Sequence, residues 1–283
     1  MENKFALVTG TSSGLGNAIA LKLANSDYIV FAGVRKNEDA QKLSSLNKNI
    51  IPIILDITDE YSVEEAFKEI KQKTDTIDVL VNNAGVALAG PVEYLTAEIL
   101  KKQFDVNVFG AIRVAQKTMA FMQKVKDARI INISSMASYA VFPFISPYCA
   151  SKRALDIFFN SLLLETKLKN LKIVSIKPGV VCTPIWNKSV SESKKNLEFL
   201  CQEGKEKYNK EFDFLLANAE KNNDKGINPQ EVADLVLKIL KIKNPKLSYN
   251  IGKDSYFARV LSFLPQKLLN FLVKCSLQKK IGC

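Results

Sequence analysis

The chain has 283 residues and a formal charge of +11, from 40 basic and 29 acidic side chains, and it contains no histidine. Its length and its 47% hydrophobic content are sufficient for one large α/β domain with a full core, so a second domain is not required. The charge permits contact with phosphates, anionic lipid or acidic substrates, but lysine is spread along the chain, which favours a solvated basic surface over a nucleic-acid site.

Cysteine usage and the N-terminus indicate a cytoplasmic protein with reduced thiols. The cysteines show no C-x-x-C spacing, and no histidine could complete a zinc site, so we expect no metal. A strand begins within about four residues of Met1, which leaves no room for a signal peptide. No apolar run reaches the roughly 20 residues of a membrane span. The five cysteines are Cys149, Cys182, Cys201, Cys275 and Cys283.

Short apolar runs alternate with helix-like segments over the first 180 residues. The runs are continuously hydrophobic, which is typical of parallel strands covered on both faces. We therefore predict an α/β fold, a Rossmann-like doubly wound parallel sheet of about seven strands with helices on both faces. The expected strands are 5–10, 28–35, 50–58, 77–85, 128–135, 172–179 and 247–252, and the expected helices are 14–26, 61–73, 96–125, 147–168 and 228–240.

The pattern changes after Thr183. Residues 184–226 are rich in Lys, Glu and Asn and lack a strand pattern, so we expect a helical excursion that covers the substrate. Residues 1–252 are predicted to form one domain, and 253–283 an amphipathic basic helical tail with six basic residues and one acid. For the tail, a cover for the substrate cleft or a subunit contact is favoured over an interfacial helix on anionic lipid or a loose end.

A glycine-rich turn, "TGTSSGLG", joins the first strand to the first helix. Glycines allow the backbone to turn sharply and to approach a ligand closely, and the following helix start presents unpaired N–H groups that suit a pyrophosphate. The spacing is G-x-x-x-G-x-G, and its place at the first β–α junction predicts a nucleotide site rather than a merely structural turn. The predicted contacts are Gly10, Ser12, Ser13, Gly14, Leu15 and Gly16.

The end of the second strand indicates which nucleotide is bound. Val34 occupies the position where an NAD site usually has a carboxylate, and Arg35 follows it. An arginine can hold a 2′-phosphate, so NADP(H) is preferred and NAD(H) stays an option if Arg35 is only a surface charge. Asp56, which closes the third strand, is expected to bond the adenine amino group.

Tyr148 and Lys152 share one helical face because they are four residues apart. A nearby ammonium can lower the phenol pKa from about 10 by roughly 1–3 units, so tyrosine can exchange protons in a chain without histidine. Ser134 and Ser135 end a strand at the same edge of the sheet, where one hydroxyl can bond a substrate oxygen. Asn107 interrupts the long predicted helix and could hold a water.

Together the motifs T-G-x-x-x-G-x-G, N-N-A-G, N-x-x-G, a strand-end serine, Y-x-x-x-K and P-G resemble the short-chain dehydrogenase/reductase family in its basic single-domain form, over roughly residues 4–183. The resemblance implies a catalytic tetrad of Asn107, Ser135, Tyr148 and Lys152. It also implies that Lys152 bonds the nicotinamide ribose and that Asn107 holds a water of a proton relay. Further implied cofactor contacts are Ile57, Asn83, Ala84, Gly85, Tyr148, Pro178, Gly179, Val181 and Thr183.

The opening segment is similar to the steroid- and retinol-acting branch of that family, although Ser13 stands where many NADP-preferring members have a basic residue. Apolar residues near the catalytic edge predict a hydrophobic alcohol or carbonyl as substrate, bound by Ser135, Phe142, Tyr148 and Trp186. We therefore expect an NADP(H)-dependent oxidoreductase, a homodimer or homotetramer. One alternative is a non-catalytic module that binds NADP as a sensor. The other is a nucleic-acid binder, which is disfavoured because this sequence lacks a concentrated basic patch.

Overall fold

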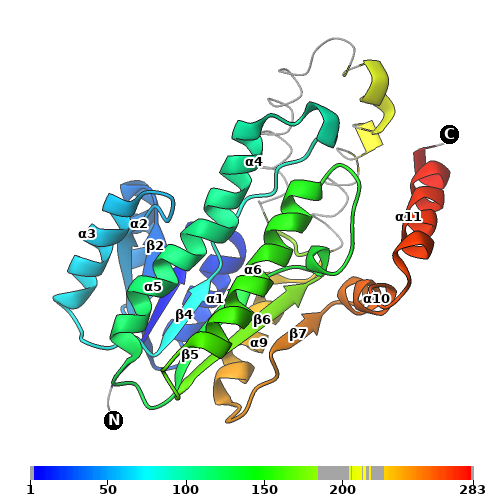
Figure 1. Cartoon of the computed structure of the whole chain (residues 1–283). Helices are drawn as coiled ribbons and strands as arrows, with labels where there is room; N and C mark the ends of the chain where they lie inside the picture. The colour runs from blue at the N-terminus through cyan, green and yellow to red at the C-terminus, as the bar shows by residue number, and fades with distance from the viewer. Residues whose placement is uncertain are drawn as a thin grey trace.

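The computed structural model describes residues 3–183, 204, 206–211, 213–214, 217 and 226–281, with side chains up to residue 279. Its centre is one seven-stranded sheet in the order β3-β2-β1-β4-β5-β6-β7, and all neighbouring strands are parallel (Figure 1). The predicted doubly wound α/β fold is confirmed. The strands are β1 Lys4–Thr9, β2 Tyr28–Val34, β3 Ile50–Ile54, β4 Val79–Asn82, β5 Ala128–Ile133, β6 Leu171–Pro178 and β7 Ser248–Ile251.

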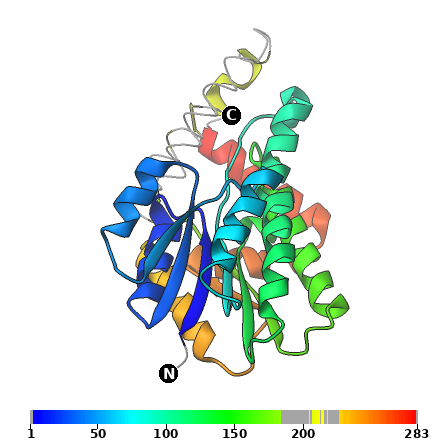
Figure 2. The ribbon, with the colours of Figure 1, turned by 90° about the vertical axis from the view of Figure 1, so that its left-hand side faces the viewer.

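Helices cover both faces of the sheet, as the two views of the ribbon show (Figures 1 and 2). α1, α2 and α9 pack with one core cluster, and α3, α5 and α6 pack with the other. Neighbouring residues of a strand go to opposite clusters: Val8 packs on the α1 side and Leu7 on the α3 side. The α-helices are α1 Gly14–Ala24, α2 Asn37–Ser44, α3 Glu60–Lys71, α4 Ala97–Phe104, α5 Ala111–Met122, α6 Ser146–Glu165, α9 Pro229–Lys241, α10 Lys253–Leu261 and α11 Gln266–Ile281.

The long helix expected over 96–125 is divided by a π-helical turn. η2 (Asp105–Gly110) separates α4 from α5, and it contains the buried Asn107. Such π turns occur often at functional sites, because the extra residue redirects side chains relative to a regular helix. Two further short helices are η1 (Val92–Tyr94) and η3 (Met136–Ser138).

The C-terminal segment forms two helices on either side of Pro265. The first, α10, packs on the domain through Ser255 and Ala258, which are almost fully buried. Figure 1 shows α10 beside the end of β7 and α11 beyond it. Within the described part of the chain, no helix is both long and apolar enough to cross a membrane.

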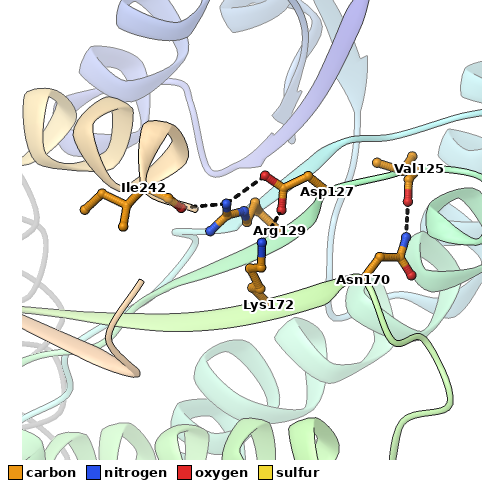
Figure 3. Close-up of polar contacts among 6 residues, drawn as sticks. All are labelled: Val125, Asp127, Arg129, Asn170, Lys172 and Ile242. Carbon is orange, nitrogen blue, oxygen red and sulfur yellow. Dashed lines mark hydrogen bonds and ion pairs between the residues drawn. The ribbon is translucent and has the colours of Figure 1, made fainter. Parts of the chain in front are cut away.

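The amino edge of the sheet is tied together by charged side chains (Figure 3). Arg129 on β5 is 2% exposed, and it donates to Asp127 at 2.7 Å and to the carbonyl of Ile242, just after α9, at 2.8 Å. Lys172 on β6 also bonds Asp127, at 2.8 Å. These contacts connect β5, β6 and the end of α9 at the edge opposite the glycine turn.

Candidate active site

The glycine turn adopts a conformation that suits a phosphate ligand. Gly10 and Gly14 have φ values of 69° and 61°, in the left-handed region that favours glycine. A Cβ on Gly16 would lie 2.3 Å from the Gly10 carbonyl oxygen, so a side chain cannot fit there. Ser13, the residue before α1, makes no capping bond with its side chain, and the first turn of α1 contains no acid. The first N–H groups of α1 are therefore oriented to receive an anion.

Two side chains hold this turn against β4. The Thr9 hydroxyl accepts bonds from the backbone N–H groups of Asn83 and Ala84, both at 3.0 Å. The Asn83 amide donates to the carbonyls of Thr9 and Gly10 at 2.9 and 3.1 Å. Asn83 was predicted to contact the cofactor; in the structure its amide braces the turn. Thr9 was not among the predicted site residues, and its position just before the first glycine was the available signal.

The residues predicted for the adenosine end lie at the carboxyl ends of β2 and β3. Arg35 is exposed and directly follows the buried Val34. One Asp56 carboxylate oxygen accepts from the Thr58 N–H and hydroxyl at 2.9 and 2.7 Å, so the carboxylate also stabilises its own turn. Ile57 is 5% exposed and packs below Gly110. Their roles toward a cofactor stay predictions.

Tyr148 and Lys152 lie together on α6, at the carboxyl edge of the sheet. The Lys152 ammonium is 5.8 Å from the centre of the Tyr148 ring and donates to the Ile133 carbonyl at 2.8 Å. Burial lowers the pKa of Lys152 to about 8, and the negative charge of Asp156 partly opposes this effect. Burial raises the pKa of Tyr148 to about 12, against a hydrogen bond from Ser135 that favours the phenolate. The lowering of this pKa that the sequence predicted from the nearby ammonium is therefore wrong for the cofactor-free protein, because burial outweighs it.

Ser135 is the member of the serine pair that reaches the tyrosine. Its oxygen accepts from the Ala137 N–H at 3.1 Å, and its hydroxyl bonds the Tyr148 phenol. The Ser134 hydroxyl is buried and has no hydrogen-bond partner in the described residues. The choice of Ser135 over Ser134 therefore agrees with the geometry, although its catalytic role is still a prediction.

The Asn107 side chain is committed to the segment after β4. Its oxygen accepts from the Val86 N–H at 2.8 Å, and its amide donates to the Val86 carbonyl at 2.9 Å and to the Ser151 hydroxyl at 3.0 Å. Gln103 holds the same segment through Leu88 and Val86, at 2.8 and 2.7 Å. Both amide hydrogens of Asn107 are thus in use, and Gln103 is a site-supporting residue that sequence reasoning missed.

Gly85 brings this support close to the lysine. A Cβ at Gly85 would lie 3.3 Å from the Asn107 amide oxygen and 3.6 Å from the Lys152 nitrogen. A side chain there would contact both groups and crowd the Asn107 oxygen, so residue 85 lies between two members of the predicted catalytic group. The segment after β4 and helix α6 meet here although they are far apart in the sequence.

The segment after β6 continues along the site. Gly179 donates its N–H to the Ile251 carbonyl at 2.9 Å, and Val181 forms a parallel bridge with Ile227. Pro178 ends β6 and Thr183 is half-buried. Their predicted contacts to a carboxamide stay predictions.

The structure describes only some of the residues that are predicted to contact the substrate. Phe142 is half-buried near the start of α6, whereas Trp186 lies outside the described residues, as do Cys201 and Cys283. In the predicted excursion, the Tyr208 hydroxyl donates to Glu93 at 2.7 Å and its ring lies 5.8 Å from Phe144. No group of three or more possible metal ligands occurs among the described residues.

The parallel sheet, the glycine turn and the pair of Tyr148 and Lys152 at the carboxyl ends of the strands together define a nucleotide-binding α/β oxidoreductase. A short-chain dehydrogenase from Streptomyces avermitilis has the same fold, with a TM-score of 0.77 and 22% identity, over 100% of this chain and 98% of that one. The sequence model of the short chain dehydrogenases matches residues 4–195, and the chain belongs to that family. The predicted family is confirmed.

Characterised and uncharacterised relatives match over most of their length. The oxidoreductase YusZ of Bacillus subtilis is 37% identical, over 89% of this chain and 90% of its own. The NADPH-dependent 3-dehydrocapnine reductase of Ornithobacterium rhinotracheale is 31% identical, over 98% of each chain. The 3-ketodihydrosphingosine reductase of Bacteroides thetaiotaomicron is 29% identical, over 97% and 98%.

Proposed function

We propose that this oxidoreductase interconverts a hydrophobic alcohol and its ketone or aldehyde, with NADP(H) as cofactor and Tyr148 as proton donor and acceptor. One observation carries the proposal: Lys152 is buried beside Tyr148, whose phenol bonds Ser135, at the same sheet edge as the glycine turn. Burying an ammonium next to a phenol costs free energy, and such groups are found mainly at functional sites, so this pair points to a role in the chemistry.

The residues present fit the cofactor. The uncapped start of α1 and the closely packed Gly16 form a cradle for a pyrophosphate, and the exposed Arg35 can hold a 2′-phosphate. The printed name of the Ornithobacterium reductase, which specifies NADPH, supports the preference for NADP(H). When bound, NADPH supplies the hydride.

The protein's own groups would orient the carbonyl and move the proton. The Ser135 hydroxyl donates to the carbonyl oxygen and holds it near Tyr148, and the phenol gives its proton to that oxygen. Lys152 stabilises the phenolate that remains, because its ammonium is close and little water separates the two. Asn107 and Gln103 hold the segment after β4, whose Gly85 lies next to Lys152, in place.

A substrate with an apolar chain is supported by Phe142 and Phe144, which are half-buried in the segment before α6, and by one relative that is named for a 3-keto substrate. The test is a panel of long-chain 3-ketones, steroids, retinoids and small ketones, with NADPH consumption followed by absorbance. We expect turnover with an apolar carbonyl. Tight NADPH binding without turnover of any carbonyl would favour a cofactor-sensing module instead.

We also propose that the enzyme forms a homo-oligomer through the face of η2 and α6. Phe109, Ile157 and Phe158 are 49%, 58% and 49% exposed there, and three large apolar side chains on adjacent helices are typical of a subunit contact. Sedimentation velocity should find a dimer or tetramer, and Phe158→Glu should dissociate it. A wild-type monomer would contradict this proposal.

For the two parts of the chain, we propose that residues 1–252 are the catalytic domain, with 184–226 as a cover for the substrate. For the tail 253–283 we propose binding to anionic lipid rather than the cleft cover or subunit contact that the sequence favoured, because the tail exposes large apolar side chains. Six basic residues and one acid give this tail +5 of the chain's +11. Its described residues, in the two helices and the turn between them, also expose large apolar side chains, and this combination suits the surface of an anionic bilayer. The exposed side chains are Tyr256, Phe257, Val260, Phe263, Leu268, Phe271 and Leu272.

A further inference from the structure

A buried ion pair lies next to Lys152, and the proposed chemistry does not use it. Lys177 Nζ and Asp156 Oδ2 are 2.8 Å apart, and the two side chains are 7% and 6% exposed. Asp156 is one helical turn beyond Lys152 on α6, and Lys177 precedes Pro178 on β6. Burying two charges costs several kcal/mol each before pairing, so such a pair is poor evidence for stability and invites a functional explanation.

Three elements fix Lys177. Its ammonium lies 4.0 Å from the centre of the Tyr139 ring, and its backbone carbonyl accepts from the Ser255 hydroxyl of α10 at 2.6 Å. The Tyr139 hydroxyl in turn donates to Asn250 on β7 at 2.8 Å. The lysine side chain therefore has little freedom to move away from Asp156.

The Asp156 carboxylate is shared between two ammonium groups. Residues at i and i+4 of a helix have Cβ atoms about 5–6 Å apart, so Asp156 acts on Lys152 across one turn while it pairs directly with Lys177. Neither of its oxygens has a partner with hydrogen-bond geometry in the described part of the chain, although Oδ2 lies 2.8 Å from Lys177 Nζ, so the pair is held by charge. Lys177 consequently neutralises part of the negative charge that Lys152 experiences.

The other groups around Lys152 add no further full charge next to it. The uncharged neighbours are Asn107 of η2, Ser135 after β5 and the Gly85 backbone after β4. The titratable and charged side chains around Lys152 and the pair are Tyr148 and Cys149 on α6, Tyr139 after η3, and Asp254 on α10, which packs against Gly179.

We propose that Asp156 and Lys177 are positioning residues that set the pH range over which Lys152 remains an ammonium ion. The effect on catalysis rests on the proposed function, in which this ammonium stabilises the phenolate of Tyr148. Asp156 favours the protonated lysine, and Lys177 limits how strongly it does so. The pair thus adjusts one lysine in a chain that has no histidine.

The sign follows from the charges. Burial lowers the pKa of Lys152 to about 8 and Asp156 raises it, so below this pH the ammonium is present, and it is lost as the pH rises through about 8. For the wild-type enzyme, kcat/KM for carbonyl reduction should therefore be level at lower pH and fall through this range.

The test is the pH profile of two variants that should shift in opposite directions. Asp156→Asn removes the negative charge, so the alkaline midpoint should move down by about one pH unit. Lys177→Met leaves the carboxylate to Lys152 alone, so the midpoint should move up by a similar amount. The matched control is Lys172→Met, which breaks an ion pair on the same strand at the opposite edge and should cause no shift.

A second measurement does not depend on turnover. In cofactor-free protein carrying isotope-labelled lysine, NMR should show the Lys152 signal, assigned by its loss in Lys152→Met, titrating with the same two shifts. Circular dichroism checks folding, and Asp156→Glu should restore the wild-type midpoint. If Asp156→Asn does not fold, Lys177→Met and its upward shift still decide the proposal.

The outcomes separate the two proposals. Unchanged midpoints with a uniformly lower rate, or shifts of the same sign in both variants, would overturn the role of the pair. Opposite NMR shifts in an enzyme that reduces no carbonyl would support the electrostatic role and refute the proposed function.

Discussion

At the scale of single residues, the proposed mechanism depends on the Tyr148 oxygen. Removing only this atom, in Tyr148→Phe, should lower kcat for carbonyl reduction by about 10²–10⁴, since a positioned acid contributes about this much. The glycine turn is untouched, so the Kd of NADPH, measured by fluorescence, should stay within about twofold. Turnover close to the wild-type rate would remove tyrosine from the mechanism.

Arg35 should distinguish the two nicotinamide cofactors. The side chain is exposed at the end of β2, where a guanidinium can form charge-assisted bonds to a 2′-phosphate. Arg35→Ala should weaken NADPH binding by about 10–100-fold, which corresponds to the roughly 1.5–3 kcal/mol of a bond to a charged group. The Kd of NADH should hardly change. Equal losses for both cofactors would refute the phosphate contact.

The residues of the site differ in how far the sequence could predict them. Tyr148, Lys152 and Ser135 follow from local spacing, because four residues make one helical turn and Ser135 ends a strand. The pairing of Asp156 with Lys177, and the grip of Thr9 and Gln103 on the β4 segment, depend on contacts between distant segments. Such contacts can be identified only from the folded structure, because they depend on how distant strands and helices are aligned.

At the scale of elements, the strands and most helices were predictable from hydrophobic runs; an interruption of the long helix at Asn107 was predicted, but its π-helical form over Asp105–Gly110 was not. A π turn shifts the helical period by one residue, which is too little to recognise in the sequence pattern, and the bonds from Asn107 to Val86 and Ser151 that accompany it are tertiary. The capped start of α9 was predictable, because Asn228 and Glu231 form a capping box within one turn.

The two C-terminal helices should bind anionic lipid. The full chain is expected to sediment with vesicles that contain phosphatidylserine, and binding should fall steeply with added salt because the attraction is partly electrostatic. The variant Phe257→Ser/Phe263→Ser should lose most of this binding and keep its activity on a soluble ketone. Equal binding to neutral vesicles, or none to anionic ones, would contradict the assignment.

Arg129 connects β5 to the end of α9, and its loss should affect stability alone. Arg129→Ala leaves the Ile242 carbonyl without this donor and creates a cavity, so the free energy of unfolding should fall by about 2–4 kcal/mol. Lys172→Ala, which removes a partly exposed partner of Asp127, should cost less than about 1 kcal/mol. Urea denaturation measures both. Equal losses would show that burial of Arg129 does not matter.

At the scale of the whole molecule, the order of the strands reverses between β1 and β4, which is where doubly wound sheets bind ligands. The sequence could predict this topology because parallel strands need crossover helices and these crossovers are right-handed. It could not predict how the segment 184–226 or the tail is placed, because these parts follow no repeated β-α pattern. The proposed chemistry and Arg129 lie at opposite edges of the sheet.

The convergence at Gly85 also affects how the protein becomes active during folding. The groups that meet there come from the segment after β4, from η2 and from α6, and a Cβ at residue 85 would fill the space between them. A truncated or half-formed sheet therefore cannot assemble the pair of tyrosine and lysine beside its neighbours. In refolding from urea, helical signal should return before enzymatic turnover, whose recovery then marks the completed native state.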